Sequence, residues 1–247
     1  MLAKRIIVVL TFLDGVLFRT KKFRPDTRYT VNFIDNTLVD EIVLIDVSNS
    51  KKNRDLFYNV IKKISKSCFV PITVGGHINN LEEIEKFQNL GVDKILINTL
   101  IYENEEMVKK ITNKYGSQFV IGGIDLMKID NKYKIFSNHG KKQLSLNIDE
   151  CLKKFESCRV GEVLVQSIDR DGSLKGYEDN INKLIKEKTN LPVIVCGGAG
   201  NWNNFIDAFK ISKVDGACTN NIYHYSEKSI KLIKETLKKK GIYVRTE

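Results

Sequence analysis

The 247-residue chain carries an internal repeat: three short segments of its first half recur, in the same order, in its second half. The pairs are Glu41-Ile-Val-Leu-Ile-Asp with Glu162-Val-Leu-Val-Gln-Ser, Pro71-Ile-Thr-Val-Gly-Gly with Pro192-Val-Ile-Val-Cys-Gly-Gly, and Val92-Asp-Lys-Ile-Leu-Ile-Asn with Val214-Asp-Gly-Ala-Cys-Thr-Asn. The offset between partners is nearly constant. Such a repeat predicts two similar structural halves, here at about residues 1–117 and 118–247.

Strand-like and helix-like segments alternate along the chain. Eight short apolar runs are typical of strands, at 4–11, 41–47, 69–74, 93–97, 118–125, 161–167, 191–196 and 214–219. Between them apolar residues recur at spacings of three and four, as in 53–66, which indicates helices that lie on a sheet. An open doubly wound sheet has the same alternation, but it gives no reason for a two-fold repeat. We therefore expect an α/β protein with a single (βα)8 TIM barrel over residues 1–247.

One irregular stretch, 126–146, interrupts this alternation after the fifth strand. This stretch is predicted to form a small hairpin. Because it follows the C-terminal end of a strand, it lies on the side where barrel active sites are built.

The composition argues against several classes of function. The net charge is +10, but the lysines are spread over the predicted helix faces, which favours steering of a phosphorylated small molecule over nucleic-acid binding. The apolar runs are too short to cross a membrane, and Asp14 and Arg19 follow the first run too soon for a signal peptide. Five cysteines show no metal-ligand spacing. We expect a cytoplasmic protein without a metal or cofactor.

Glycines and amides at four strand ends indicate phosphate binding. Gly75-Gly76 and Gly197-Gly198-Ala199-Gly200 end the third and seventh strands, and Asn98-Thr99 and Asn220-Asn221 end the fourth and eighth. Glycine lets backbone N–H groups approach a phosphate closely. Ordinary turn chemistry would need the same glycines. The matched positions predict two phosphate half-sites on opposite rims.

Acidic residues also end strands. Asp46 ends the second strand and Asp125 the fifth, where a carboxylate is well placed for acid–base work. A helix cap or a salt bridge is the alternative role. After the sixth strand, Asp171-Gly172-Ser173 either offers donors to a phosphate or forms only a turn.

Seven segments, in their order along the chain, resemble the cyclase subunits of imidazole glycerol phosphate synthase over essentially the whole length. They are Met1-Leu-Ala-Lys-Arg-Ile-Ile, Thr73-Val-Gly-Gly, Ile97-Asn-Thr, Tyr115-Gly-Ser-Gln, Ser167-Ile-Asp-Arg-Asp-Gly, Gly197-Gly-Ala-Gly and Gly241-Ile-Tyr-Val-Arg. The resemblance implies that a glutaminase subunit docks on the N-terminal face of the barrel. Ammonia from glutamine would then pass through the barrel to a ligand at the opposite face.

The resemblance also assigns a charged gate at the barrel floor, formed by Arg5, Glu41, Lys94 and Glu162. It places Asp93 near the glutaminase interface. Four charges on apolar strands are costly unless they pair with one another, so a purely structural ionic layer would need the same residues. We favour the gate, because the resemblance supplies its purpose.

The active-site end departs from the family. The family's first catalytic aspartate, which the repeat sets opposite Asp125, is Thr11 here, and the loop from Gly15 to Tyr29 looks shorter than the family's mobile loop. His77 replaces a glycine of the strand-three turn, Gln166 replaces a small hydroxyl residue, and Asn220-Asn221 replaces Ala-Ser. Asp125 and the pair Asn98-Thr99 are kept.

Three functions are compatible with this pattern. The first is an ammonia-channelling subunit that serves a different acceptor, as family paralogues do when they act with a glutaminase and a separate ligase to amidinate surface sugars. Its acceptor would be a phosphorylated small molecule or a sugar nucleotide. The second is the ordinary cyclase of histidine biosynthesis, with another residue acting in place of Thr11. The third is a catalytically silent barrel that binds and activates the glutaminase.

Overall fold

Eight parallel strands form a closed barrel in the computed structural model, which describes residues 2–28, 39–220 and 229–245. The barrel strands are β1 (Arg5–Leu13), β4 (Glu41–Asp46), β5 (Ile72–Gly75), β6 (Lys94–Ile97), β7 (Val120–Ile129), β10 (Glu162–Ser167), β11 (Val193–Cys196) and β12 (Gly216–Thr219). Each pairs with the next, and β12 pairs with β1 to close the ring. All eight predicted strands are present, and the predicted TIM barrel is confirmed.

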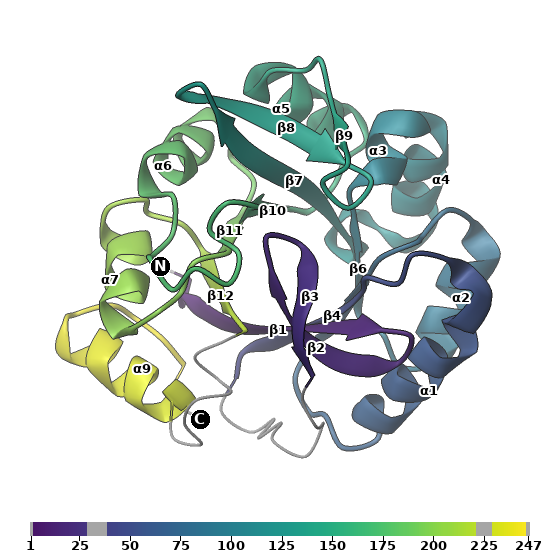
Figure 1. Cartoon of the computed structure of the whole chain (residues 1–247), viewed down its shortest axis with the longest axis horizontal. Helices are drawn as coiled ribbons and strands as arrows, with labels where there is room; N and C mark the ends of the chain where they lie inside the picture. Colours follow the sequence, from purple (N-terminus) through teal and green to yellow (C-terminus); the bar gives the residue numbers. More distant parts are fainter. Residues whose placement is uncertain (1, 29–38, 221–228, 246–247) are drawn as a thin grey trace.

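Helices surround the barrel on its outside (Figure 1). They are α1 (Arg54–Ser65), α2 (Leu81–Asn89), α3 (Thr99–Glu103), α4 (Glu105–Tyr115), α5 (Ile148–Ser157), α6 (Asp179–Lys188), α7 (Trp202–Lys210) and α9 (Ser229–Lys239), with 3-10 turns η2 (Lys51–Asn53) and η3 (Ser117–Phe119). Their buried faces pack against the outer side of the strands in one large apolar core. No helix in the described part of the chain is both long and apolar enough to span a membrane.

Two β-hairpins stand on the C-terminal side of the strands. The predicted one continues β7 into β8 (Lys132–Ser137) and β9 (Lys142–Gln143). The other, β2 (Val16–Lys21) and β3 (Arg24–Arg28), follows β1 where we expected only a loop. Its tip, Lys22-Phe23, has positive φ at both residues, as a two-residue hairpin turn requires. Those residues lack the Asn-Gly signal of such turns, whereas the turn from β1 to β2, Asp14-Gly15, carries the Asp-Gly signal and could have been recognised.

The two halves repeat in detail as well as in topology. A Cβ added to Gly76 would lie 2.1 Å from the carbonyl oxygen of Asp46, and one added to Gly197 would lie 2.7 Å from that of Ser167. Gly76 and Gly197 are repeat partners, and so are Asp46 and Ser167. At both places one strand-end turn touches the end of the neighbouring strand, so glycine is needed for space as well as for its positive φ.

Candidate functional site

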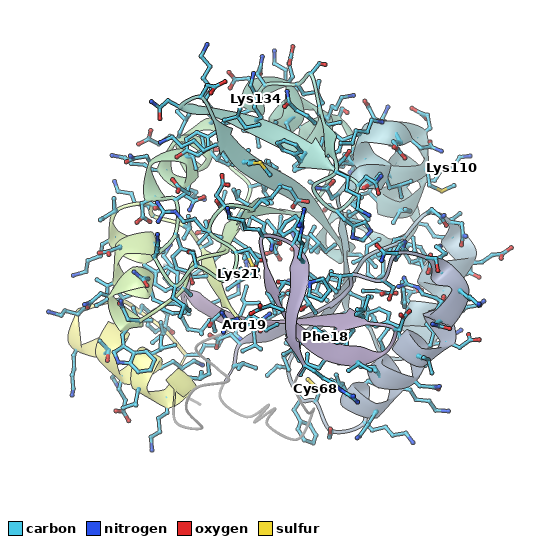
Figure 2. The ribbon with its side chains drawn as sticks, in the orientation of Figure 1. Phe18, Arg19, Lys21, Cys68, Lys110 and Lys134 are labelled. Carbon is cyan, nitrogen blue, oxygen red and sulfur yellow. The ribbon has the colours of Figure 1, made fainter. Side chains whose placement is uncertain are left out.

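A cavity of about 340 Å³ opens at the C-terminal mouth of the barrel. Strand ends contribute Thr11, Gly76, Asn98, Asp125 and Gln166 to its wall. The hairpins add further lining residues, namely Thr20 and Phe23 from one and Asn138, His139 and Lys141 from the other. Figure 2 labels Phe18, Arg19 and Lys21 of the first hairpin, which stands over the middle of the barrel in this view.

Asp125 is the titratable group best suited to proton transfer in this cavity. Its burial raises the carboxyl pKa from 3.8 to about 7, the negative charge of Asp171 adds to the rise, and a hydrogen bond from Asn98 opposes it. Near neutral pH both the protonated and the ionised forms are therefore populated. A carboxyl group in this state can donate or accept a proton without a large free-energy cost.

Thr11 lies in the same cavity wall but offers no base. Its buried hydroxyl donates a hydrogen bond to the backbone carbonyl of Phe18 in β2. The nearby Asp14 does not replace the missing aspartate, because it is exposed in the turn before β2 and accepts a hydrogen bond from Asn53.

The predicted first half-site comes together beside Asp125. Gly76, His77, Asn98 and Thr99 all line the cavity. The Asn98 Oδ1 atom is buried without a hydrogen-bond partner, so it can accept a bond from a ligand. The Thr99 hydroxyl, in contrast, is engaged by the backbone N–H of Asn138, at 3.0 Å.

The residues of the second half-site surround a separate hollow of only about 30 Å³. Those that line it are Asp171, Gly172, Gly197, Gly198 and Asn220. Ser173 does not line the hollow, and its hydroxyl accepts a bond from the Lys175 N–H at 3.3 Å. Asn221 lies outside the described residues.

Asp171 explains why this hollow is small. Its carboxylate accepts hydrogen bonds from the Thr20 hydroxyl at 3.1 Å and from the Phe23 N–H at 3.0 Å. The tip of the β2–β3 hairpin is thereby fastened over the second half-site. We expected this stretch either to offer donors to a phosphate or to form a turn, and its Asp171 carboxylate instead accepts hydrogen bonds from the hairpin.

Asp46 forms a salt bridge, which was the alternative to a role in acid–base chemistry. It is 2% exposed, and its carboxylate lies 2.5 Å from Arg54 Nη1. Arg54 also pairs with the buried Glu83 at 2.8 Å and donates to the Gly76 carbonyl at 2.8 Å. This buried network holds the strand-three turn in place, and Asp46 is not free for acid–base work.

The four predicted floor residues form an alternating ring of charges at the N-terminal end of the barrel. Arg5 contacts Glu41 at 3.1 Å and Glu162 at 2.5 Å, while Lys94 contacts the same two carboxylates at 3.2 Å and 2.7 Å. Burial acts to lower the pKa of Arg5 and to raise that of Glu162, but their mutual hydrogen bond and charge outweigh it. The pKa of Arg5 is raised and that of Glu162 lowered, so both stay ionised.

Apolar side chains fill the barrel between this ring and the cavity. They are Ile7, Val9, Val43, Ile121, Leu164, Ile194 and Cys218, with Ile45, Leu96 and Cys196 packed against them. A small uncharged molecule can move through such an interior more readily than an ion, because an ion would lose its hydration there.

Asp93 lies exposed just before β6. Its carboxylate accepts a hydrogen bond from the Ile72 N–H at 2.8 Å, and its repeat partner Asp215 accepts one from the Val193 N–H at 2.9 Å. Both aspartates thus hold the start of the neighbouring strand. The position of Asp93 near a glutaminase interface stays a prediction.

The sequence did not single out Lys51, Asn138, His139 or Lys141, although all four line the cavity. The stretch 126–146 was recognised as a hairpin on the active-site side. Nothing in the sequence shows, however, that its second turn reaches the strand-three turn.

Comparisons with known proteins agree with this architecture. A family model described as histidine biosynthesis protein matches residues 7–229. Imidazole glycerol phosphate synthase subunit HisF of Chlorobium chlorochromatii is 35% identical over 250 residues, and that of Hydrogenobaculum sp. is 33% identical over 252 residues. Each alignment covers 99% of this chain and 100% of the relative. The chain therefore belongs to the histidine biosynthesis protein family, together with these HisF subunits.

Proposed function

We propose that this chain is the ammonia-accepting barrel subunit of a glutamine-dependent synthase. A glutaminase partner would dock on the N-terminal face, over the ring of Arg5, Glu41, Lys94 and Glu162. The observation that carries the proposal is the order of layers along the barrel axis. A charged ring lies at one end, an apolar interior follows, and a cavity with the proton-transferring Asp125 lies at the other end.

The acceptor at the mouth is a phosphorylated small molecule or a sugar nucleotide in acetamidino-sugar biosynthesis, with a separate ligase as a further partner. Thr11 supports a changed acceptor, since its hydroxyl is committed to Phe18 and the paired carboxylate of the family's cyclisation chemistry is missing. The fastened β2–β3 hairpin supports it as well, because it reduces the second half-site to about 30 Å³. Delivery of ammonia needs a route through the apolar interior and a proton-transfer group, and Asp125 is suited to the second task.

The second candidate is the cyclase of histidine biosynthesis. Full-length similarity to HisF subunits favours it more directly than any comparison favours a sugar acceptor. In this case Asp125 would work with a residue other than Thr11. Asp171 is a carboxylate whose charge acts on Asp125, but it would have to release Thr20 and Phe23.

One experiment separates these functions. The purified barrel is supplied with ammonium salts and the nucleotide substrate of the family's cyclases, beside an ordinary cyclase as the reference. Loss of one member of an acid–base pair costs about 10²–10⁴-fold in rate, so we expect turnover lower by that factor. Turnover within about tenfold of the reference would establish the cyclase and refute the changed acceptor.

A second arm tests the ammonia-accepting role itself. With a glutaminase subunit and glutamine labelled with ¹⁵N at the amide, the label should appear in a sugar-derived product, and Asp125→Asn should abolish that transfer without unfolding the barrel. A barrel that stimulates glutamine hydrolysis while no label reaches any acceptor would instead be catalytically silent.

A further inference from the structure

Gln166 lies between the two hollows at the mouth of the barrel. Its side chain lines both the cavity of about 340 Å³ and the smaller hollow of about 30 Å³. In β10 it follows Glu162 and Leu164, and alternate residues of a strand face the same side, so all three face the inside of the barrel. Glu162 belongs to the charged ring, Leu164 to the apolar interior and Gln166 to the cavity. This strand therefore contributes one residue to each layer along the barrel axis.

Asp125 has an amide side chain on the neighbouring strand at either side. Gln166 pairs with Asp125 in the register of β10 and β7, which lie side by side (Figure 1). Asn98, at the end of β6, forms a hydrogen bond with the Asp125 carboxyl group. Neighbouring strands are about 4.8 Å apart, so side chains in register on the same face lie within reach of one small molecule. A single ligand can therefore contact both amides and the carboxyl group.

Both amides have an acceptor oxygen to offer. The Asn98 Oδ1 atom is buried without a partner, while its Nδ2 donates to the Phe136 carbonyl at 3.4 Å. Within the described residues, no protein group forms a hydrogen bond with the half-buried Gln166 carboxamide. The hydroxyl of Thr11, in contrast, lies in the same wall but is bonded to the Phe18 carbonyl. A polar group left unpaired inside a barrel costs free energy unless a ligand or a water molecule bonds to it.

The interior of the barrel reaches these amides from below. On β7 the residue that precedes Asp125 on the same face is Gly123. A Cβ added to Gly123 would lie 3.3 Å from that of Asn98, which places the glycine on the inside of the barrel. β7 therefore puts no side chain between the apolar Ile121 and the carboxyl group. A molecule that leaves the apolar interior at this strand meets Asp125 and the two amides first.

Ammonia has the chemistry that this position accepts. It carries three N–H donors and one lone pair, and it crosses an apolar layer without the loss of hydration that an ion suffers. An amide oxygen accepts an N–H without carrying a charge, so it does not favour protonation of the neighbouring nitrogen as a second carboxylate would. Two amide oxygens can thus bind two N–H groups of ammonia and leave its lone pair free.

We propose that Gln166 binds ammonia at its exit from the apolar interior. Its Oε1 atom accepts one N–H, the Asn98 Oδ1 atom accepts a second, and the nitrogen is held beside Asp125 with its lone pair free for the acceptor substrate. The inference rests on the proposed function and deepens it by naming the residue that receives ammonia. It also gives a reason for a carboxamide at a position where the resemblance leads us to expect a small hydroxyl residue, since a shorter side chain would leave the nitrogen with one amide.

Nuclear magnetic resonance on the barrel alone tests this binding without a glutaminase or an acceptor. Ammonium chloride is titrated into the parent chain in alkaline buffer, where part of it is ammonia, and the side-chain amide signals of Gln166 are followed. The chain has four glutamines, so Gln166→Leu assigns these signals by difference. They should shift saturably with ammonia. Potassium chloride supplies a cation of similar size without N–H donors and should leave them in place.

Gln166→Leu separates binding from space filling, because leucine has a similar volume but no carboxamide. In this variant the backbone amide signal of Asp125 reports on ammonia, whose affinity should fall about five- to tenfold, as expected for the loss of one hydrogen bond. The midpoint of thermal unfolding should not fall, since the lost carboxamide has no protein partner among the described residues. The matched control is Gln143→Leu, because Gln143 is exposed on β9 at the same side of the barrel. It should bind ammonia as the parent does.

Two results would overturn the proposal. The Gln166 signals would not respond to ammonia, or would respond equally to potassium; or Gln166→Leu would bind ammonia as tightly as the parent. Saturable binding at Gln166 without transfer of the ¹⁵N label to any acceptor would keep the ammonia site and refute the proposed function. Transfer of the label without binding at Gln166 would do the reverse, so the two failures are distinguishable.

Discussion

The hydroxyl of Thr11 donates its hydrogen bond to the backbone carbonyl of Phe18, within the hairpin that β1 and β2 form. Thr11, which the resemblance sets in place of a catalytic aspartate, is therefore tied to β2. Among the described residues that line the cavity, the carboxylates are Asp125 and Glu103, and Glu103 is paired with Lys142. Asp125 is therefore the carboxylate of this wall that is not in an ion pair.

Replacing Asp125 with Asn should remove a pH dependence of stability. The carboxyl pKa is about 7 in the folded chain against 3.8 without burial. Between these values the unfolded state releases its proton while the folded state keeps it, so the free energy of unfolding of the parent falls as the pH rises and levels off above 7. The Asn variant does not lose stability in this way. As the pH rises from about 4 to about 8, its free energy of unfolding should therefore increase relative to that of the parent by roughly 1–3 kcal/mol.

Urea unfolding of both proteins at several pH values measures this gain. Asp149→Asn serves as the control, since Asp149 forms a surface pair with Lys188 and its side chain is 58% exposed. That variant should differ from the parent by about 1 kcal/mol or less at every pH. A difference between Asp125→Asn and the parent that does not change with pH would show that the carboxyl titrates normally.

Gly76→Ala should destabilise the barrel much more than Gly116→Ala. Both glycines have positive φ, 92° and 88°, so alanine is strained at either site, by about 1–3 kcal/mol. The added Cβ meets the Asp46 carbonyl at 2.1 Å in the first case and nothing within 4 Å in the second. Overpacking should add about 1–3 kcal/mol at Gly76 alone. Equal midpoints of thermal unfolding for the two variants would show that the strand-three turn can move away from β4.

Sequence reasoning could predict the barrel because its signals are local. β-branched runs and helical spacing define the elements, and the repeat removes the open-sheet alternative. Glycines at strand ends could be placed in the same way, since the close approach of Gly76 to Asp46 recurs at Gly197 and Ser167. The charged ring was predictable from the resemblance, because its members occupy fixed positions on the first, second, fourth and sixth barrel strands.

The remaining features depend on contacts between loops. The pairing of Asp171 with Thr20 and Phe23 joins residues about 150 positions apart, and no local pattern predicts it. The meeting of His77 with His139 likewise depends on where a hairpin points. The role of Asp46 was open between catalysis and a salt bridge until Arg54 was seen beside it. The geometry between loops, on which ligand binding in the cavity depends, therefore could not be predicted from the sequence.

Asp171→Ala should loosen the β2–β3 hairpin. The change removes the acceptor of the Phe23 N–H and of the Thr20 hydroxyl, at a cost of about 1–3 kcal/mol in local stability. Amide hydrogen exchange at Phe23 should therefore speed up by about tenfold or more. The control is Asp169→Ala in the same loop, whose carboxylate accepts from the Lys128 N–H at 2.7 Å and so holds the other hairpin. It should accelerate exchange at Lys128 and leave Phe23 unchanged; equal effects at both amides would mean that the two hairpins open together.

Lys94→Met separates an ammonia gate from a structural ionic layer. Methionine keeps the packing of the lysine stem while removing its bridge between Glu41 and Glu162. Arg5 still contacts both carboxylates, so we expect a loss of only about 1–2 kcal/mol in stability, less than for a fully unpaired buried charge. If the ring gates ammonia, the complex with the glutaminase should lose glutamine-driven product formation and keep its activity with ammonium salts. Glutamine hydrolysis should continue, uncoupled from product.

The matched control for this variant is Lys4→Met. Lys4 precedes β1 at the same end of the barrel and pairs with Asp215 at 3.4 Å, with 19% of its side chain exposed against 16% for Lys94. Its pair lies outside the ring, so its loss should leave both nitrogen sources equally effective. The gate is refuted if Lys94→Met lowers activity with glutamine and with ammonium salts in the same proportion, in step with the midpoint of thermal unfolding. That outcome would mean that the four charges serve to close the barrel floor and that ammonia, if it enters, takes another route.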